Sequence, residues 1–167
     1  MQLGTVFMEP EFPPGKLADW YLDPDIPAVL NHNSRGYMKP DLQRYFFWSE
    51  YTRFFGKSPK LGDVPRSFLP AHRNVDEGKF TDRFRVQVSG RPSNTVTSHI
   101  RKDGHAYIHH DPLQCRSWSA REAARAQSFP DNYFFEGPIT EQYGQVGNAV
   151  PPLLAKQIGE IVARMLT

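Results

Sequence analysis

The pattern of hydrophobic and polar positions predicts three helices, the first of them within residues 41–55. Seven of the eleven residues from Tyr45 to Phe55 are aromatic, and they cover most sides of the helix that they would form. A helix that is apolar on most sides is usually buried, so we expect this segment to pack in a core. A base-stacking platform is the alternative use of such an aromatic run.

Two later segments carry the start and stop signals of helices. Ser119 and Glu122 have the spacing of a capping box, and the residue before Pro130 avoids helical geometry, which predicts a helix over residues 119–128. Residues 151–166 predict a C-terminal helix that begins with two prolines. Its apolar positions fall on one face: Leu154, Ile158, Ile161, Val162 and Met165.

Residues 83–110 show a different period. Apolar and polar residues alternate from Phe84 to Val88 and again over residues 95–100, as they do in half-buried strands. Asp103-Gly104 is a strong hairpin signal. Together with the helices, this pattern predicts an α+β fold, in which a small antiparallel β meander accompanies several short helices and a C-terminal helix.

The same patterns suggest how the chain is divided. Residues 1–30 are broken by prolines and predict an irregular N-terminal segment. Residues 31–140 are expected to form one domain, helical over 41–55, β over 83–110 and helical again over 119–128. Residues 141–167 then form the C-terminal part, which ends in the amphipathic helix.

Composition excludes several classes of protein. The chain has 167 residues, of which 39% are hydrophobic and 13% aromatic, so it can build a core and is not wholly disordered. No stretch approaches the roughly 20 apolar residues of a membrane span. Residues 1–4 lack the basic and apolar regions of a secretion signal. Cys115 is the only cysteine, so no disulfide can form within the chain. Because the sequence also shows no secretion signal and no membrane span, we expect a cytoplasmic protein without membrane contact.

The net charge says little about function, whereas the distribution of basic residues along the chain is informative. The chain has 20 Lys+Arg against 18 Asp+Glu, a net charge of +2 that neither proves nor excludes nucleic-acid binding. Basic residues crowd the second half of the chain: Arg83, Arg85, Arg91, Arg101, Lys102, Arg116, Arg121 and Arg125. Arginine suits bidentate contacts with phosphate and guanine, although a solvated protein face would show the same residues.

Other chemistry-bearing residues give weaker signals. His105 and His109 have a spacing that could bind zinc on a helix, but no further ligand pattern accompanies them, so we expect no metal site. Cys115 is expected to be a packing residue rather than a nucleophile. Gly144 and Gly147 are expected to precede a helix N-terminus, where exposed N–H groups attract anions.

Two blocks of sequence resemble the DNA (cytosine-5)-methyltransferase family. Residues 116–131, RSWSAREAARAQSFPD, resemble the REAARLQ-x-FPD block of that family, and residues 145–155, QVGNAVPPLLA, resemble its closing block. Residues 91–97 resemble the part of the target-recognition region that carries a Thr and a branched apolar residue. Residues 31–74 resemble the recognition region of bacterial members, so the resemblance covers most of the chain.

Other blocks of the same family are missing from the sequence. Members carry a glycine-rich cofactor loop, a Pro-Cys nucleophile and a Glu-Asn-Val that engages the base. Here Cys115 follows Gln114, and residues 73–75 read Arg-Asn-Val, so the carboxylate is absent. The resemblance therefore implies a C-terminal half that supplies no catalytic residue and is inactive alone, which leaves open whether the chain counts as an enzyme.

The function implied by the resemblance is methylation of cytosine C5 in duplex DNA by S-adenosylmethionine, as in restriction-modification systems. The chain would be the DNA-recognition and C-terminal part of such an enzyme. A non-catalytic DNA-binding module and a degenerate remnant are the alternatives. The expected partners are duplex DNA and the catalytic half of the enzyme, and self-association through the helix over 151–166 is a further expectation, because its apolar face needs a cover.

The resemblance also assigns roles to individual residues. Those expected to bind DNA are Arg85, Arg91, Thr95, Val96, Thr97, Arg101 and Lys102. Those expected at the edge of the S-adenosylmethionine site of the complete enzyme are Asn148, Ala149 and Val150. Those expected to organise the scaffold are Arg121, Glu122 and Gln127.

Overall fold

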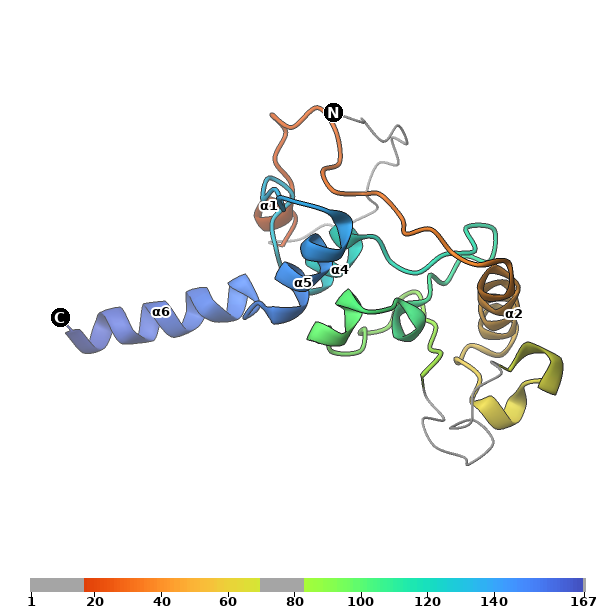
Figure 1. Cartoon of the computed structure of the whole chain (residues 1–167). Coiled ribbons are helices and arrows are strands. Elements are labelled where there is room, and N and C mark those ends of the chain that lie inside the picture. Colours follow the sequence, from red (N-terminus) through yellow and green to blue (C-terminus); the bar gives the residue numbers. More distant parts are fainter. Residues whose placement is uncertain (1–16, 70–82, 167) are drawn as a thin grey trace. The chain divides into compact units, whose positions relative to one another are not determined.

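The computed structural model describes residues 17–69 and 83–166 of the chain (Figure 1). Its α-helices are α1 (Ala18–Tyr21), α2 (Lys39–Phe55), α4 (Ala120–Ala126), α5 (Ile139–Asn148) and α6 (Pro152–Leu166). Its 3-10 helices are η1 (Leu61–Asp63), η2 (Arg66–Phe68), η3 (Ser98–Arg101) and η4 (His105–Tyr107). No helix in these two stretches is long and apolar enough to cross a membrane.

The described residues form two compact units, which the chain enters more than once. Unit 1 comprises residues 17–33, 96–101 and 119–166. Unit 2 comprises residues 34–69, 83–95 and 102–118. The short segment 96–101, which carries η3, therefore belongs to unit 1 although the residues on either side of it belong to unit 2.

The predicted antiparallel β meander over residues 83–110 is wrong, and with it the α+β class. The described part of the chain holds no β-strand; it has two isolated bridges, a parallel one from Val86 to Ile108 and an antiparallel one from Ile108 to Ser117. The Gln87 side-chain amide donates to the Ala106 carbonyl (2.7 Å) and accepts from the Asn94 N–H (3.0 Å). The Gln87 side chain thus forms hydrogen bonds with backbone groups that would pair with each other or with a neighbouring strand in a sheet.

Alternation from Phe84 to Val88 indicates partly buried chain rather than a sheet, and the burial itself is not strictly alternate, because Gln87 is buried and Val88 only half-buried. Phe84 and Val86 are buried in the core of unit 2. A second strand was expected over residues 95–100, but residues 98–101 form η3. An alternating sequence is compatible with extended chain that finds no continuous strand partner, so the pattern alone could not separate a strand from such chain.

Helix α2 supplies the centre of unit 2, close to its predicted position. Pro40 lies in its first turn, and Gly56 ends it with a left-handed φ of 66°. Tyr45 and Trp48 are fully buried. They pack in one cluster with Leu61, Val64, Phe84, Val86 and Ile108. Most of the other aromatic residues of α2 are not buried; Phe54, for example, is 80% exposed.

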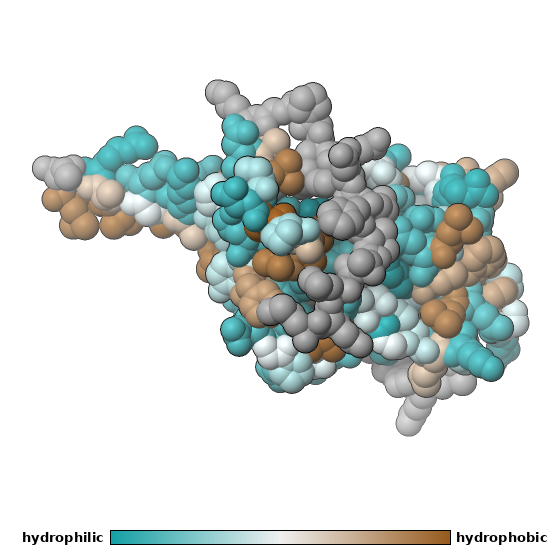
Figure 2. All heavy atoms as spheres, turned by 90° about the horizontal axis from the view of Figure 1, so that it is seen from above, coloured by the Kyte–Doolittle hydropathy of each residue, from teal (hydrophilic) through white to brown (hydrophobic). Residues whose placement is uncertain are grey.

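Helices α4 and α6 lie in unit 1 and confirm two helices expected from the sequence. The capping box of α4 is formed: Glu122 N donates to Ser119 Oγ (3.1 Å), and Ser119 N donates to a Glu122 carboxylate oxygen (2.7 Å). Helix α6 contains no buried residue. Figure 2 shows its apolar side chains gathered along one side of the helix, where Leu154, Ile158 and Ile161 are about half exposed.

Candidate functional site

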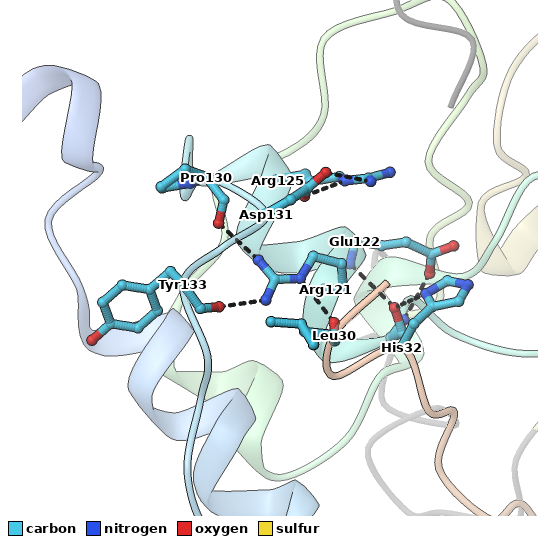
Figure 3. Close-up of polar contacts among 9 residues, drawn as sticks. Leu30, His32, Arg121, Glu122, Arg125, Pro130, Asp131 and Tyr133 are labelled. Carbon is cyan, nitrogen blue, oxygen red and sulfur yellow. Dashed lines mark hydrogen bonds and ion pairs between the residues drawn. The ribbon is translucent and has the colours of Figure 1, made fainter. Parts of the chain in front are cut away.

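Arg121 is the central polar residue of unit 1. Its side chain is fully buried, and it donates hydrogen bonds to the carbonyls of Leu30 (2.9 Å), Pro130 (3.0 Å) and Tyr133 (2.5 Å), as Figure 3 shows. The guanidinium carbon lies 5.5 Å from the centre of the Phe135 ring. Burial lowers the pKa of Arg121 to about 10, so the side chain remains charged at neutral pH. One side chain therefore joins two separate stretches of backbone, at Leu30 and over residues 130–133, to α4.

A second arginine of α4 closes the following loop. Arg125 makes a bidentate pair with Asp131, with N–O distances of 2.8 and 2.7 Å (Figure 3). The Tyr21 hydroxyl, from α1, donates to the Arg125 carbonyl (3.1 Å). Burial and the nearby Asp131 charge raise the pKa of Tyr21. Bidentate pairing fixes the guanidinium in two directions, so the residues after α4 are held in one path.

The sequence reasoning missed two residues of this scaffold, Asn31 and His32. Asn31 has a left-handed φ of 56°, which asparagine tolerates better than most residues. Its side-chain amide exchanges two hydrogen bonds with the backbone of Phe135, both of 2.9 Å. The His32 ring Nδ1 lies 2.8 Å from Ser119 Oγ, at the start of α4. No motif marked either residue, because each acts on residues far along the chain.

Gln127 connects the two segments that were expected to contact DNA and cofactor. The residue is buried, and its side-chain Nε2 lies 3.5 Å from the Val96 carbonyl, 3.1 Å from the Val146 carbonyl and 3.5 Å from the Ala149 carbonyl. Val96 belongs to the expected DNA-binding segment, and Ala149 to the expected cofactor edge. The structure thus brings these two segments together within unit 1.

Helix α5 packs closely against η3, and this packing accounts for its two glycines, Gly144 and Gly147. A Cβ added to Gly147 would lie 2.7 Å from the Thr97 carbonyl oxygen and 2.9 Å from Ser98 Cα. A Cβ added to Gly144 would lie 3.2 Å from Cδ of Arg101. Both glycines lie inside α5, and α6 begins after them at Pro152, so anion binding at the start of that helix stays a prediction. Gly147 allows the close approach of backbone, and Gly144 the close approach of the Arg101 side chain.

The expected DNA-binding residues are mostly on the surface, but they do not all belong to one unit. Arg85, Arg91, Thr95 and Lys102 belong to unit 2, whereas Val96, Thr97 and Arg101 belong to unit 1. Val96 is buried and Arg85 half-buried, and the other five are exposed. Val96 therefore supports its neighbours by packing rather than by presenting a side chain to solvent.

The expected cofactor-edge residues follow one another at the end of α5. Asn148 is the last residue of the helix and is exposed, Ala149 is half-buried, and Val150 is 60% exposed. An exposed amide can bond the amino or carboxylate group of S-adenosylmethionine. The exposure of Asn148 and Val150 is compatible with an edge contact with that cofactor, which stays a prediction.

Histidine and cysteine residues take structural roles here. Among residues 17–69 and 83–166, no group of three or more His, Cys, Asp or Glu side chains could hold a metal ion. His105 Nδ1 lies 2.8 Å from the hydroxyl of the buried Tyr45, and burial lowers the pKa of His105. The Cys115 thiol donates to the Pro112 carbonyl (3.0 Å), and burial raises its pKa, which disfavours the reactive thiolate.

Comparison with known proteins agrees with the two sequence blocks. The sequence profile of the C-5 cytosine-specific DNA methylase family matches residues 30–164. The type II methyltransferase M.Bpa9945I of Bacillus paralicheniformis is 47% identical over 83% of this chain and 30% of its own length. The type II methyltransferase M1.HphI of Haemophilus parahaemolyticus is 34% identical over 83% of this chain and 32% of its own length.

A more distant source gives a shorter match. DNA (cytosine-5)-methyltransferase 1 of the mouse is 48% identical over 75 residues, which make up 45% of this chain and 5% of the mouse protein. The chain thus spans about a third of the length of the two bacterial relatives described above. Since the family profile matches most of the residues, the chain belongs to the C-5 cytosine-specific DNA methylase family.

Proposed function

We propose that the chain is the target-recognition and C-terminal part of an enzyme that methylates cytosine C5 in duplex DNA. The observation that carries the proposal is the position of Gln127. Its amide reaches the carbonyls of Val96 and Ala149, so the segment proposed to grip DNA and the segment proposed to border the cofactor share one buried anchor. An enzyme that transfers a methyl group to DNA needs these two surfaces in register.

The proposed roles follow from exposure and charge. The exposed side chains of Arg91, Thr95, Thr97, Arg101 and Lys102 bind phosphates and base edges, and Arg85 supports them. The buried Val96 holds the segment in place. When bound, S-adenosylmethionine supplies the methyl group, while Asn148 orients its polar end and Val150 excludes water beside it. Arg121 and Glu122 keep α4 and its loops in place around Gln127.

The chain needs a partner for chemistry under this proposal. It lacks a Pro-Cys nucleophile, and the Cys115 thiol is held protonated against a carbonyl. We propose that the missing catalytic half covers the apolar face of α6, which the described part of this chain leaves exposed. Self-association through that face takes its place when the catalytic half is absent, and a cytoplasmic location remains part of the proposal.

Complementation tests the proposed function. The chain is mixed with a separate polypeptide that carries the glycine-rich, Pro-Cys and Glu-Asn-Val blocks of the family, and transfer of labelled methyl groups to duplex DNA is measured. We expect transfer by the mixture and none by either polypeptide alone. Transfer by this chain alone would contradict the proposed division of labour.

Duplex binding by the chain separates the remaining alternatives. Fluorescence anisotropy with a labelled duplex of mixed sequence is expected to show binding that weakens steeply with salt, because phosphate contacts release counterions. Binding without complementation would favour the non-catalytic DNA-binding module. Failure of both experiments would favour a degenerate remnant.

A further inference from the structure

In the protein without DNA, Arg101, one of the proposed DNA-binding arginines, forms an ion pair with Glu141. Arg101 Nη2, at the end of η3, lies 2.5 Å from a carboxylate oxygen of Glu141, in the first turn of α5. Both side chains are about half exposed, at 49% and 50%. The pair is therefore accessible to a competing anion such as a phosphate.

Both the aliphatic part and the guanidinium of Arg101 contact α5. A Cβ added to Gly144, one turn after Glu141, would lie 3.2 Å from Arg101 Cδ, so the Arg101 side chain is in close contact with the helix at that position. The aliphatic part of Arg101 therefore lies flat on the helix, and its guanidinium reaches back to Glu141. Tight packing of Gly147 on Thr97 and Ser98 fixes η3 on the same helix. Arg101 is thus directed towards Glu141 by packing as well as by charge.

Glu141 is suited to release its partner. Its position in the first turn of α5 places the carboxylate near the positive end of the helix dipole, which stabilises it when Arg101 leaves. An exposed ion pair is weak, so a phosphate of duplex DNA can replace the carboxylate at small cost. The exchange moves Arg101 from an internal anion to an external one.

We infer that Glu141 acts as an internal phosphate substitute that restrains the binding of Arg101 to DNA. The inference rests on the proposed function, because it assumes that this face meets duplex DNA. In the free protein Arg101 is paired with Glu141. On DNA, a phosphate takes the place of the carboxylate, and Glu141 takes up a cation from solution. Because that cation uptake offsets the counterion that the phosphate releases, the Arg101 contact adds little salt dependence.

Two matched variants test this restraint. Glu141→Gln removes the competing charge, and Glu136→Gln removes another exposed glutamate just before α5. Affinity for a fluorescein-labelled duplex of mixed sequence is measured between about 50 and about 200 mM salt. We expect Glu141→Gln to bind about three- to fivefold more tightly at the low-salt end. The slope of log affinity against log salt should steepen by about 0.9, and more than in Glu136→Gln.

A double variant removes the remaining ambiguity. In a background of Arg101→Gln, the change Glu141→Gln should have no more effect than Glu136→Gln, because the restrained arginine is gone. Equal effects of the two glutamate changes in the wild-type background, or an undiminished effect in the Arg101→Gln background, would overturn the inference while leaving DNA binding intact. If no variant binds duplex DNA at any salt, the assumption that this face meets DNA fails, and the inference fails with it, whereas the proposed function is still decided by complementation.

Discussion

Helix α4 buries four of its seven residues, whereas α6, with fifteen residues, buries none. Both helices belong to unit 1, and the sequence predicted both of them. They differ in where their partners come from. The buried face of α4 meets Asn31, His32 and the loop around Pro130, all within this chain. The apolar face of α6 meets no such cover among the described residues.

The contrast shows that helical signals and burial are separate properties. The capping box and alanines of α4 favour a helix locally, but its burial depends on residues about a hundred positions upstream. The pattern over 151–166 is also a helix signal, but the apolar side of that helix is exposed among the described residues. One unit thus holds a helix with its packing partners and a helix for which we propose a partner outside the described residues.

The largest difference in stability between α4 and α6 is expected when the buried charge of Arg121 is removed. Arg121→Met leaves the carbonyls of Leu30, Pro130 and Tyr133 without their donor, so we expect a loss of about 3–5 kcal/mol in the free energy of unfolding. Urea denaturation measures it. The same change at the exposed Arg164 of α6 should alter stability by less than about 0.5 kcal/mol. Equal losses at the two positions would contradict the contrast.

A glycine pair gives effects of opposite sign in α5 and α6. Gly147→Ala places a Cβ against Thr97 and Ser98 and should cost about 1–3 kcal/mol. Gly159→Ala meets nothing within 4 Å and should stabilise α6 by about 0.5–1 kcal/mol, because alanine favours helix. Thermal unfolding followed by circular dichroism compares the two. A stabilising Gly147→Ala would disprove close packing of α5 on η3.

Removing the cap of α4 should have an intermediate to small effect. Ser119→Ala deletes the acceptor of the Glu122 N–H and the partner of His32, with an expected loss of about 1 kcal/mol. The exposed Ser93 offers a control, since Ser93→Ala changes no cap. Chemical denaturation of both variants checks the difference. A loss no greater than in the control would remove the capping box from the account of α4.

The smallest change in stability is expected on the apolar face of α6. Ile158, half exposed, should tolerate Ile158→Gln with a change of less than about 0.5 kcal/mol. The variant should nevertheless weaken self-association of the chain and its binding to the catalytic half, because a polar group replaces part of the proposed interface. Sedimentation velocity over a range of concentrations measures this. A large loss of stability would mean that α6 packs internally in solution.

The sequence predicted best those features that depend on neighbours in the chain. Pro40 in the first turn and Gly56 at the end bracket α2, and Ser119 caps α4 through the Glu122 N–H. These signals act within one or two turns of a helix, so a single sequence is sufficient to recognise them. The family blocks also assigned Arg121 and Gln127 to a scaffold; both residues are buried, and their organising role stays a prediction.

Features that depend on distant residues could not be obtained in the same way. The alternation of Phe84 and Val86 indicated burial correctly, but whether a partner strand exists is decided elsewhere in the chain. Gly144 and Gly147 look like turn residues in the sequence, and only the approach of η3 to α5 reveals why glycine is needed. The partnership of Asn31 with Phe135 spans 104 positions and has no local signature.

The assignment of residues 96–101 to unit 1 has a consequence for any exchange of unit 2 between this chain and its relatives. The chain passes between the units after residues 33, 95, 101 and 118, so unit 2 is an insertion in two pieces. A chimera that exchanges unit 2 must therefore graft residues 34–95 and 102–118 together and retain the six residues between them. A single-block exchange would carry away η3, the platform on which α5 rests.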